Sequence, residues 1–164
     1  MMLAIRKAVS KDFQTLIKIM KESTTDEEVI GFAPPEGISP TFLKELAEEL
    51  NRSDPSVIIA EKDGIPVGFA YYSFQNEFVE IQEVDVIKEY QGQGIGKALM
   101  QHIEEITKEK GMNCLVTGTS INKNGKPWKA YGFWLQMGFI DTGERIQGTH
   151  RLKYVKLVKQ IPKA

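Results

Sequence analysis

The segment YQGQGIGKALMQHI, Tyr90–Ile103, carries the strongest structural signal in this chain. Gly92, Gly94 and Gly96 stand directly before a stretch with the apolar spacing of a helix. A glycine-rich turn at this place exposes backbone N–H groups at the positive end of the helix dipole. Such a turn is suited to bind an anion, most often a phosphate.

Two common phosphate motifs do not fit the spacing of this turn. A Walker A loop ends in Gly-Lys-Ser or Gly-Lys-Thr, whereas Ala98 follows Lys97 here, so no hydroxyl is available for magnesium. A dinucleotide fingerprint needs Gly-x-Gly-x-x-Gly, whereas the three glycines of this turn alternate. On spacing alone, a flexible turn without a ligand is the remaining alternative.

The segment before the turn, FVEIQEVDVI, predicts a strand with an irregular apolar pattern. Its apolar positions include Val79, Ile81, Val84 and Val86. The alternation slips by one residue between the first pair and the second, which predicts a β-bulge within Gln82–Asp85. The alternative is a strand buried on both faces, in which the alternation carries no information.

The remaining pattern predicts a mixed α/β (α+β) protein. Strands are expected over 3–9, 113–121, 139–146 and 150–158, and a hairpin over 56–74 with its turn at Asp63-Gly64. Helices are expected from an N-cap at Ser10, from Pro40, from the glycine turn to Gly111, and over 129–137 with Gly138 as C-cap. The connection Ser23–Ser39 has no pattern of its own, which is typical of functional loops.

The composition of the 164 residues excludes several classes of protein. Basic residues number 21 against 22 acidic residues, and a net charge of −1 argues against a nucleic-acid partner. Cys114 is the single cysteine, so no internal disulfide can form and a reducing compartment is expected. The sequence has no long apolar run or signal-peptide pattern, which predicts a cytoplasmic protein without membrane contact. The length predicts one domain, 1–164.

The segment EVDVIKEYQGQGIGKALM resembles the acetyl-CoA-binding segment of the GNAT superfamily of N-acetyltransferases. Gln91, Gly94 and Gly96 match the Gln/Arg-x-x-Gly-x-Gly/Ala pattern of that family, after a strand that ends near Val86. The order of the expected elements and the late helix GFWLQMGF resemble the family as well. The resemblance implies a GNAT fold, with a central mixed, mostly antiparallel sheet, a bulged and splayed strand, and helices on both faces.

The resemblance implies acetyl-CoA as the cofactor and indicates the residues that bind it. Backbone amides of the turn would surround the pyrophosphate, and a β-carbon at the glycines would prevent close approach. The main chains of Val84 and Val86 would pair with the pantetheine arm. The full set of expected cofactor contacts is Val84, Val86, Gln91, Gly92, Gln93, Gly94, Ile95, Gly96, Lys97, Asn122 and Trp134.

The resemblance also implies transfer of the acetyl group to a primary amine by direct attack in a ternary complex. An alkyl ammonium has a pKa of about 10.4, so the reaction needs removal of a proton. Carboxylates are frequent in the bulged strand, at Glu80, Glu83 and Asp85. Glu83 is the first choice as base or amine-binding group, and Glu80 is the second. An exposed strand carboxylate without a catalytic role is the alternative for each.

The last helix departs from the family pattern. Where many members have a tyrosine that protonates the thiolate, this chain has Trp134, whose indole N–H is too weak an acid. Tyr131 lies one turn earlier and is the candidate substitute, although ordinary core packing is the favoured interpretation of this residue. If neither residue acts, water or the solvent-exposed thiolate itself suffices. A non-catalytic acyl-CoA-binding module is therefore a rival function, and a nucleotide phosphotransferase is another.

The sequence constrains the partners only in class. The acceptor is expected to be an amine of a small molecule or a peptide, and a homodimer is left open. The acidic segment Asp26–Glu28 favours a cationic acceptor or is simply a solvated charge run. His102 and His150 lack metal-ligand spacing, so no metal is expected.

Overall fold

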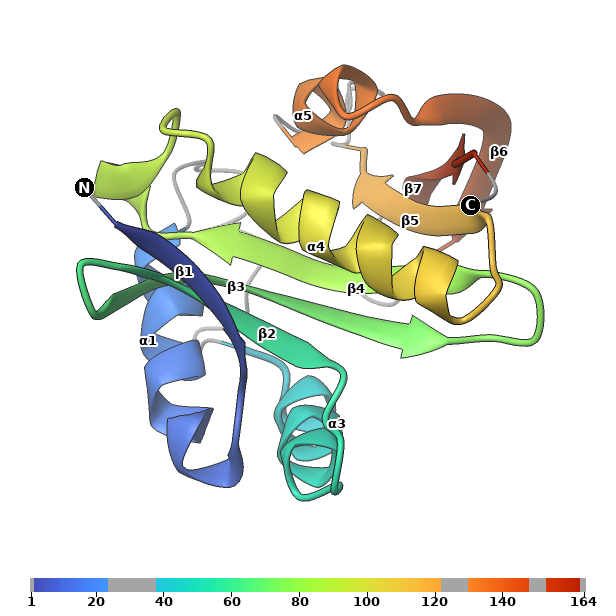
Figure 1. Ribbon diagram of the computed structural model, residues 1–164. Coiled ribbons are helices and arrows are strands. Elements are labelled where there is room, and N and C mark those ends of the chain that lie inside the picture. Colours follow the sequence, from blue (N-terminus) through green and yellow to red (C-terminus); the bar gives the residue numbers. More distant parts are fainter. Residues whose placement is uncertain (1, 24–37, 122–129, 148–152, 163–164) are drawn as a thin grey trace. The chain divides into compact units, whose positions relative to one another are not determined.

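Seven strands form one mixed sheet, as the sequence predicts, with the hydrogen-bonded order β1-β2-β3-β4-β5-β7-β6 (Figure 1). β4 and β5 pair in parallel, whereas β1–β2, β2–β3, β5–β7 and β6–β7 are antiparallel. The strands are β1 Leu3–Lys7, β2 Val57–Lys62, β3 Ile65–Phe74, β4 Val79–Val86, β5 Cys114–Ser120, β6 Ile140–Gln147 and β7 Lys153–Gln160.

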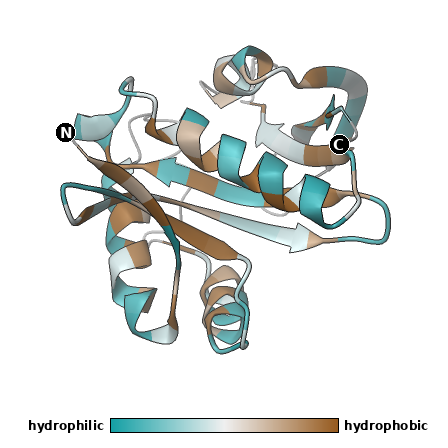
Figure 2. Cartoon of the chain, viewed as in Figure 1, coloured by the Kyte–Doolittle hydropathy of each residue, from teal (hydrophilic) through white to brown (hydrophobic). Residues whose placement is uncertain are grey.

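The helices also follow the predicted order. They are α1 Phe13–Ser23, α3 Pro40–Leu50, α4 Ile95–Glu109 and α5 Ala130–Gln136, with the short 3₁₀ helices η1 Ser10–Asp12 and η2 Lys88–Tyr90. Along α4, hydrophobic and hydrophilic residues occupy different sides of the helix (Figure 2), which is the pattern of a helix that packs with one face. Among the described helices, none is long and apolar enough to cross a membrane.

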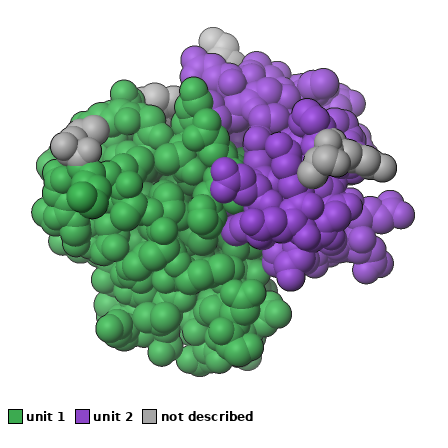
Figure 3. Space-filling view, viewed as in Figure 1, with its two compact units in different colours: residues 1–72, 83–102 green, residues 73–82, 103–164 purple. Residues whose placement is uncertain are grey.

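The computed structural model describes residues 2–23, 38–121, 130–147 and 153–162. By their contacts, the residues divide into two compact units (Figure 3). Unit 1 comprises residues 1–72 and 83–102, and unit 2 comprises 73–82 and 103–164. β4 and α4 each run from one unit into the other. The single domain over 1–164 stays a prediction.

In unit 1, helices cover both faces of the sheet, as predicted. Val57 and Ile59 of β2 are fully buried in a core cluster with residues of α1 and α3, among them Leu16 and Leu46. Alternate residues of a strand point to opposite faces, so Ile58 and Ala60, which are equally buried, lie on the other face. On β3, the position of a Cβ at Gly68 is within 3.3 Å of the Ile95 side chain of α4.

Most of the predicted chain reversals are confirmed by the backbone angles. Asp63 and Gly64 both have positive φ, 51° and 83°, which is the type I′ geometry expected of a two-residue hairpin. Gly111 and Gly138, with φ of 75° and 93°, follow the ends of α4 and α5. Ser39 precedes Pro40 and caps α3 by accepting a hydrogen bond from Phe42 N at 3.5 Å.

The predicted N-cap at Ser10 is wrong. The chain enters α1 through η1, and the Asp12 carboxylate accepts the hydrogen bond of the Val9 N–H at 2.8 Å. Asp12 is held in this place by Arg6, whose Nη1 lies 2.9 Å from its Oδ2. The ion pair therefore decides which side chain caps the first turn, and the local preference of serine does not.

The hydrogen bonds between β3 and β4 show one extra residue in β4 between Phe78 and Ile87, whereas the place predicted for the bulge, around Gln82–Asp85, stays a prediction. In unit 2, Gln75 N donates to Phe78 O at 2.9 Å, and in unit 1 Ile87 N donates to Val67 O at 2.9 Å. Between these two bonds β3 advances by eight residues, whereas β4 advances by nine. One extra residue in β4 is the definition of a bulge, and it accounts for the slip in the apolar pattern.

β4 meets β5 in unit 2 through a short parallel ladder. Val79 pairs with Leu115, and Glu80 pairs with Val116. One residue further on, the Thr117 hydroxyl donates to Ile81 O at 3.2 Å. The splay of the rest of β4 stays a prediction.

Candidate active site

The turn between β4 and α4 is built by two glycines with left-handed backbone. Gly92 has φ of 79° and Gly94 has φ of 83°, values that side chains with a β-carbon rarely adopt. η2 leads into the turn, with Tyr90 N donating to Ile87 O at 2.8 Å. α4 then begins with a bond from Ala98 N to Gly94 O at 3.0 Å. The sequence pattern thus correctly predicts a sharp glycine turn directly before a helix.

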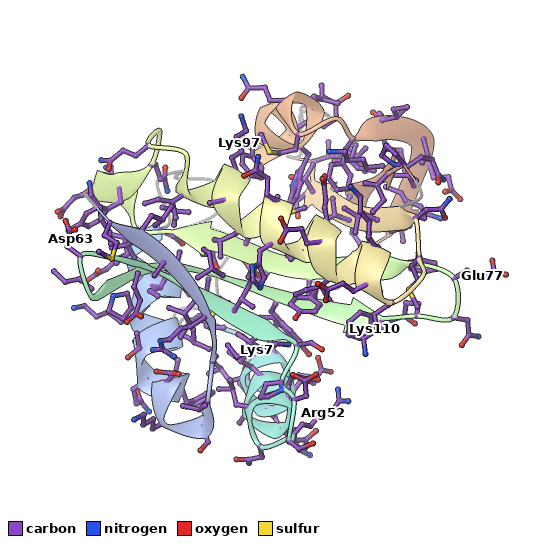
Figure 4. All side chains as sticks on the ribbon, viewed as in Figure 1. Lys7, Arg52, Asp63, Glu77, Lys97 and Lys110 are labelled. Atoms are coloured by element: carbon purple, nitrogen blue, oxygen red, sulfur yellow. The ribbon has the colours of Figure 1, made fainter. Side chains whose placement is uncertain are left out.

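The first turn of α4 presents three backbone donors. The N–H groups of Ile95, Gly96 and Lys97 have no hydrogen-bond acceptor among the described residues, as expected for the start of a helix. Lys97 lies on this same turn and is exposed (Figure 4). Free N–H groups, the helix dipole and a lysine charge together favour an anion at this end of α4.

The space beside Gly92 and Gly94 is open. A β-carbon built on Gly92 or Gly94 would meet no described atom within 4 Å. The protein therefore does not need these glycines to avoid a clash with itself. Their positive φ shapes the turn, and their open side is where a phosphate group could approach the backbone.

The side chains of Gln91 and Gln93, in the turn, already form hydrogen bonds with other groups of the protein. Gln93 Oε1 accepts a hydrogen bond from Lys62 Nζ at 2.6 Å, and its Nε2 donates to Glu89 O at 3.4 Å. Gln91 Nε2 donates to two carbonyl oxygens, Val86 O at 2.8 Å and Ser23 O at 3.0 Å. The cofactor contacts expected of Gln91 and Gln93 remain predictions, and their amide groups already stabilise the turn.

Glu83 and Asp85, two residues apart near the end of β4, form an interacting carboxyl pair. Both side chains are partly buried, and burial raises the pKa of both. The pKa of Asp85 reaches about 6, while the Asp85 charge and hydrogen bond add to burial in raising the pKa of Glu83 well above its usual value. Two carboxyl groups this close cannot both ionise easily, so the pair favours a state with one proton.

Ser23, at the end of α1, also affects this pair. Its hydroxyl donates to Met20 O at 2.9 Å, and its interaction with Asp85 lowers the pKa of that carboxyl. Sequence analysis named Asp85 among the carboxylates of the strand without giving it a role, and it missed Ser23. The pair itself has a sequence signal, because residues two apart in a strand share a face. Ser23 lies far from β4 in the sequence and has none.

Glu80 is placed differently from Glu83. It belongs to unit 2, pairs with Val116 and is partly buried between the buried Val79 and Ile81. As their neighbour in the strand, it points to the opposite face. Its role as a second candidate base stays a prediction.

Trp134 and Tyr131 of α5 both have contacts close by in the structure. Trp134 is 5% exposed and packs edge-on against Phe133 and Phe139, with ring centroids 5.0 and 5.1 Å away. The Tyr131 hydroxyl donates to Asp141 at 3.0 Å, and that hydrogen bond raises the pKa of Tyr131. Tyr131 as proton donor and Trp134 as cofactor contact therefore stay predictions, with local partners that account for both side chains.

Of the remaining candidates, the structure describes only His102 and Cys114. Asn122 and His150 are outside the described residues, as is the acidic segment Asp26–Glu28. His102 is partly buried on α4. Cys114 is partly buried on β5, and burial raises the pKa of its thiol, which fits an unreactive packing residue.

Comparison with known protein families shows to which family this chain belongs. The family described as acetyltransferase (GNAT) matches residues 15–139, which is most of the chain. This chain belongs to the GNAT acetyltransferase family. The match includes β4, the glycine turn and α4, which contain the segment that resembles the acetyl-CoA-binding segment of the family.

Two relatives show that the sequence identity to similar proteins is low. An uncharacterized N-acetyltransferase of Methanocaldococcus jannaschii is 26% identical over 119 residues, 68% of this chain and 48% of the relative. Streptothricin acetyltransferase of Streptomyces lavendulae is 28% identical over 126 residues, 76% of this chain and 64% of the relative. The chain thus spans about half of the first relative and under two thirds of the second.

Solved structures agree on the fold. The ribosomal-protein-S18-alanine N-acetyltransferase from Escherichia coli superposes with a TM-score of 0.74 at 17% identity, covering 99% of this chain and 96% of the other. The PaiA N-acetyltransferase from Thermoplasma acidophilum, solved in complex with coenzyme A, gives a TM-score of 0.69 at 20% identity, covering 98% and 99%. The GNAT fold predicted from the sequence is confirmed.

Proposed function

We propose that this chain transfers an acetyl group from acetyl-CoA to a primary amine by direct attack in a ternary complex. The observation that carries this function is the pairing, within unit 1, of a turn with free backbone donors and a partly buried carboxyl pair. The first can hold an anionic cofactor, and the second can take a proton from an ammonium group.

The cofactor would be held by the start of α4. The N–H groups of Ile95, Gly96 and Lys97 would donate to the pyrophosphate oxygens, and the Lys97 charge would add to the helix dipole. Val84 and Val86 would contact the pantetheine arm through their main chains, although Val86 O already accepts a hydrogen bond from Gln91. Acetyl-CoA supplies an acetyl group activated as a thioester. Coenzyme A bound to the PaiA protein of the same fold supports this choice.

Glu83 would accept the proton of the acceptor amine. Its raised pKa makes it a stronger base once ionised than an exposed carboxylate, since base strength follows pKa. Its partial burial lowers the local dielectric, which strengthens its attraction for an ammonium group. Glu83 thus combines the two tasks expected of it, amine binding and proton removal.

The proteins similar to this chain indicate two classes of acceptor. The names of similar proteins include streptothricin, a small molecule, and an alanine of a ribosomal protein. The acceptor proposed for this chain is therefore an amine of either class, bound with its charge toward the carboxyl pair.

A thiol-release screen tests the proposal. Purified protein is incubated with acetyl-CoA and polyamines, aminoglycosides, amino acids or peptides with a free N-terminus, and coenzyme A release is followed spectrophotometrically. Release with at least one amine and formation of the acetylated product by mass spectrometry are expected. Calorimetric binding of coenzyme A without release across the panel would instead favour an acyl-CoA-binding module. The engaged Tyr131 hydroxyl and the buried Trp134 are the observations that keep this second function in view.

A further inference from the structure

We infer that Lys62, at the end of β2, is a positioning residue that holds the glycine turn in shape through Gln93 and Tyr90 and adds its positive charge beside the turn. This inference rests on the proposed function, because it assigns a task to a residue next to the proposed cofactor site. Lys62, the turn and the first residues of α4 all belong to unit 1.

Two contacts join Lys62 to the glycine turn. Its Nζ donates a hydrogen bond to Gln93 Oε1 at 2.6 Å, and the same Nζ lies 5.3 Å from the centroid of the Tyr90 ring, within the range of a cation–π interaction. Lys62 and Gln93 are separated by 31 positions in the sequence. The end of β2 is thereby attached to the last residue of η2, which leads into the turn, and to a residue of the turn itself.

Gln93 carries this contact into the backbone of the turn. It lies between Gly92 and Gly94, which both have positive φ. One orientation of its side-chain amide satisfies two bonds, since Oε1 accepts from Lys62 and Nε2 donates to Glu89 O at 3.4 Å. Glycines lose more conformational freedom on ordering than other residues. A side chain held from outside the turn therefore reduces the entropy that the turn must lose when it binds an anion.

The charge of Lys62 is not neutralised by a carboxylate among the described residues. Within those ranges, the partly buried lysine and arginine side chains are Arg6, Lys62, Lys156 and Lys159. The other three each form an ion pair with a carboxylate, whereas Lys62 contacts a neutral amide and an aromatic ring. Its charge therefore adds to the helix dipole and to Lys97 in favouring an anion at the turn.

The carboxylates next to Lys62 in the sequence are bonded to other groups. Glu61 Oε1 lies 3.1 Å from Arg6 Nε, in an ion pair. Asp63 Oδ1 accepts a hydrogen bond from Met2 N at 2.9 Å. The nearest acidic neighbours in the chain thus leave the Lys62 charge available to the turn.

Calorimetry of the whole chain with coenzyme A tests this role without any acceptor. Lys62→Met keeps the apolar stem but removes the charge and the donor, and it should weaken coenzyme A binding about fivefold. Lys62→Arg keeps both and should stay within about twofold of the wild type. In the thiol-release assay, Lys62→Met should raise KM for acetyl-CoA by the same factor and leave kcat nearly unchanged, because Lys62 acts on binding and not on the chemical step.

Lys110→Met is the matched control. Lys110 Nζ lies over the Phe74 ring at the same distance of 5.3 Å, but Lys110 follows the other end of α4. Its loss removes one lysine charge and one cation–π contact away from the turn. Coenzyme A affinity should therefore equal that of the wild type at physiological salt, where distant charges are screened.

Gln93→Leu tests whether Lys62 acts through the turn. This variant removes the acceptor of the Lys62 bond and should weaken coenzyme A binding about threefold. The double variant Lys62→Met/Gln93→Leu should lose less than the product of the two single losses, because both substitutions break the same contact. Gln93→Leu also gives a reading if Lys62→Met folds poorly. Thermal unfolding without ligand is measured in parallel, since a merely structural contact would lower stability and leave the affinity unchanged.

The outcomes separate this inference from the proposed function. Weaker coenzyme A binding in Lys62→Met, restored by Lys62→Arg and coupled to Gln93, upholds the inference even if no amine is acetylated, in which case acetyl transfer alone is rejected. Unchanged affinity in Lys62→Met, a loss that Lys62→Arg shares, or independent losses at the two positions would overturn the inference and leave acetyl transfer standing. A wild-type protein that binds no coenzyme A overturns both.

Discussion

The glycine turn before α4 and the helix α5 both match segments typical of the GNAT family, yet they differ in how their polar groups are satisfied. At the turn, the N–H groups of Ile95–Lys97 have no acceptor within the described chain. At α5, the Tyr131 hydroxyl bonds Asp141, and Trp134 is buried between two phenylalanines. The family resemblance alone gave both regions a role in cofactor chemistry.

The comparison shows that hydrogen-bonded polar groups and free polar groups differ as evidence for a binding site. A polar group with a local partner has a structural explanation, whereas aligned donors at an open helix start are available to an anionic ligand. On this basis the function of the chain depends mainly on the turn and on the carboxyl pair of β4. Variants of the two regions should therefore differ strongly in their effects.

Gly94→Val should have the largest effect, the loss of coenzyme A binding. A β-carbon at this position meets no described atom within 4 Å, and in the proposed binding mode it would take up space needed by the pyrophosphate. Calorimetry with coenzyme A should show affinity reduced by at least about 100-fold, because several charge-assisted hydrogen bonds are lost together.

Gly64→Val provides a closely matched control. Gly64 has the same φ of 83° and equally open space, but it lies in the β2–β3 turn. Both substitutions impose comparable backbone strain, so the two variants should lose similar thermal stability. Coenzyme A affinity equal in the two variants would contradict the assignment of the turn.

Glu83→Gln should reduce turnover by about 100-fold and leave coenzyme A affinity within about twofold, since loss of a general base typically costs this much. Glu80→Gln is the control from the same strand, and it should retain most of the activity. The measurement is thiol release from pH 6 to 9 with the best acceptor of the screen. Unaltered turnover of Glu83→Gln across this range would exclude Glu83 as the base.

Asp85→Asn should stabilise the protein at neutral pH. The pKa of Asp85 is raised to about 6 in the folded state, so the stability it contributes is present below about pH 4 and is lost as pH rises through 6. Removing the carboxylate should raise the free energy of unfolding at pH 7 by up to about 3 kcal/mol, and by little at pH 4. Urea unfolding at both pH values measures the difference. An equal effect at both would show that the carboxyl is not perturbed.

The features that the sequence predicted well are those with a local cause. The Asp63-Gly64 turn, the proline start of α3, the glycine ends of α4 and α5 and the bulge of β4 follow from residues within a few positions of each other. The Ser10 cap failed because Arg6 fixes Asp12 instead. The Gln91–Ser23 bond could not be predicted, because it joins residues that only the folded sheet and α1 bring together.

The smallest effect is expected from Tyr131→Phe, and it sharpens the contrast between the turn and α5. The Tyr131 hydroxyl donates to Asp141, and that carboxylate raises the pKa of Tyr131 and so makes it a poorer proton donor. Turnover should therefore change by less than about twofold, as expected for a residue outside the rate-limiting chemistry. Thiol release as a function of pH is the measurement, with Phe133→Leu as a control for packing in α5. A tenfold loss together with a changed alkaline limb would restore Tyr131 as the acid that protonates the thiolate, and α5 would then belong to the active site beside the turn.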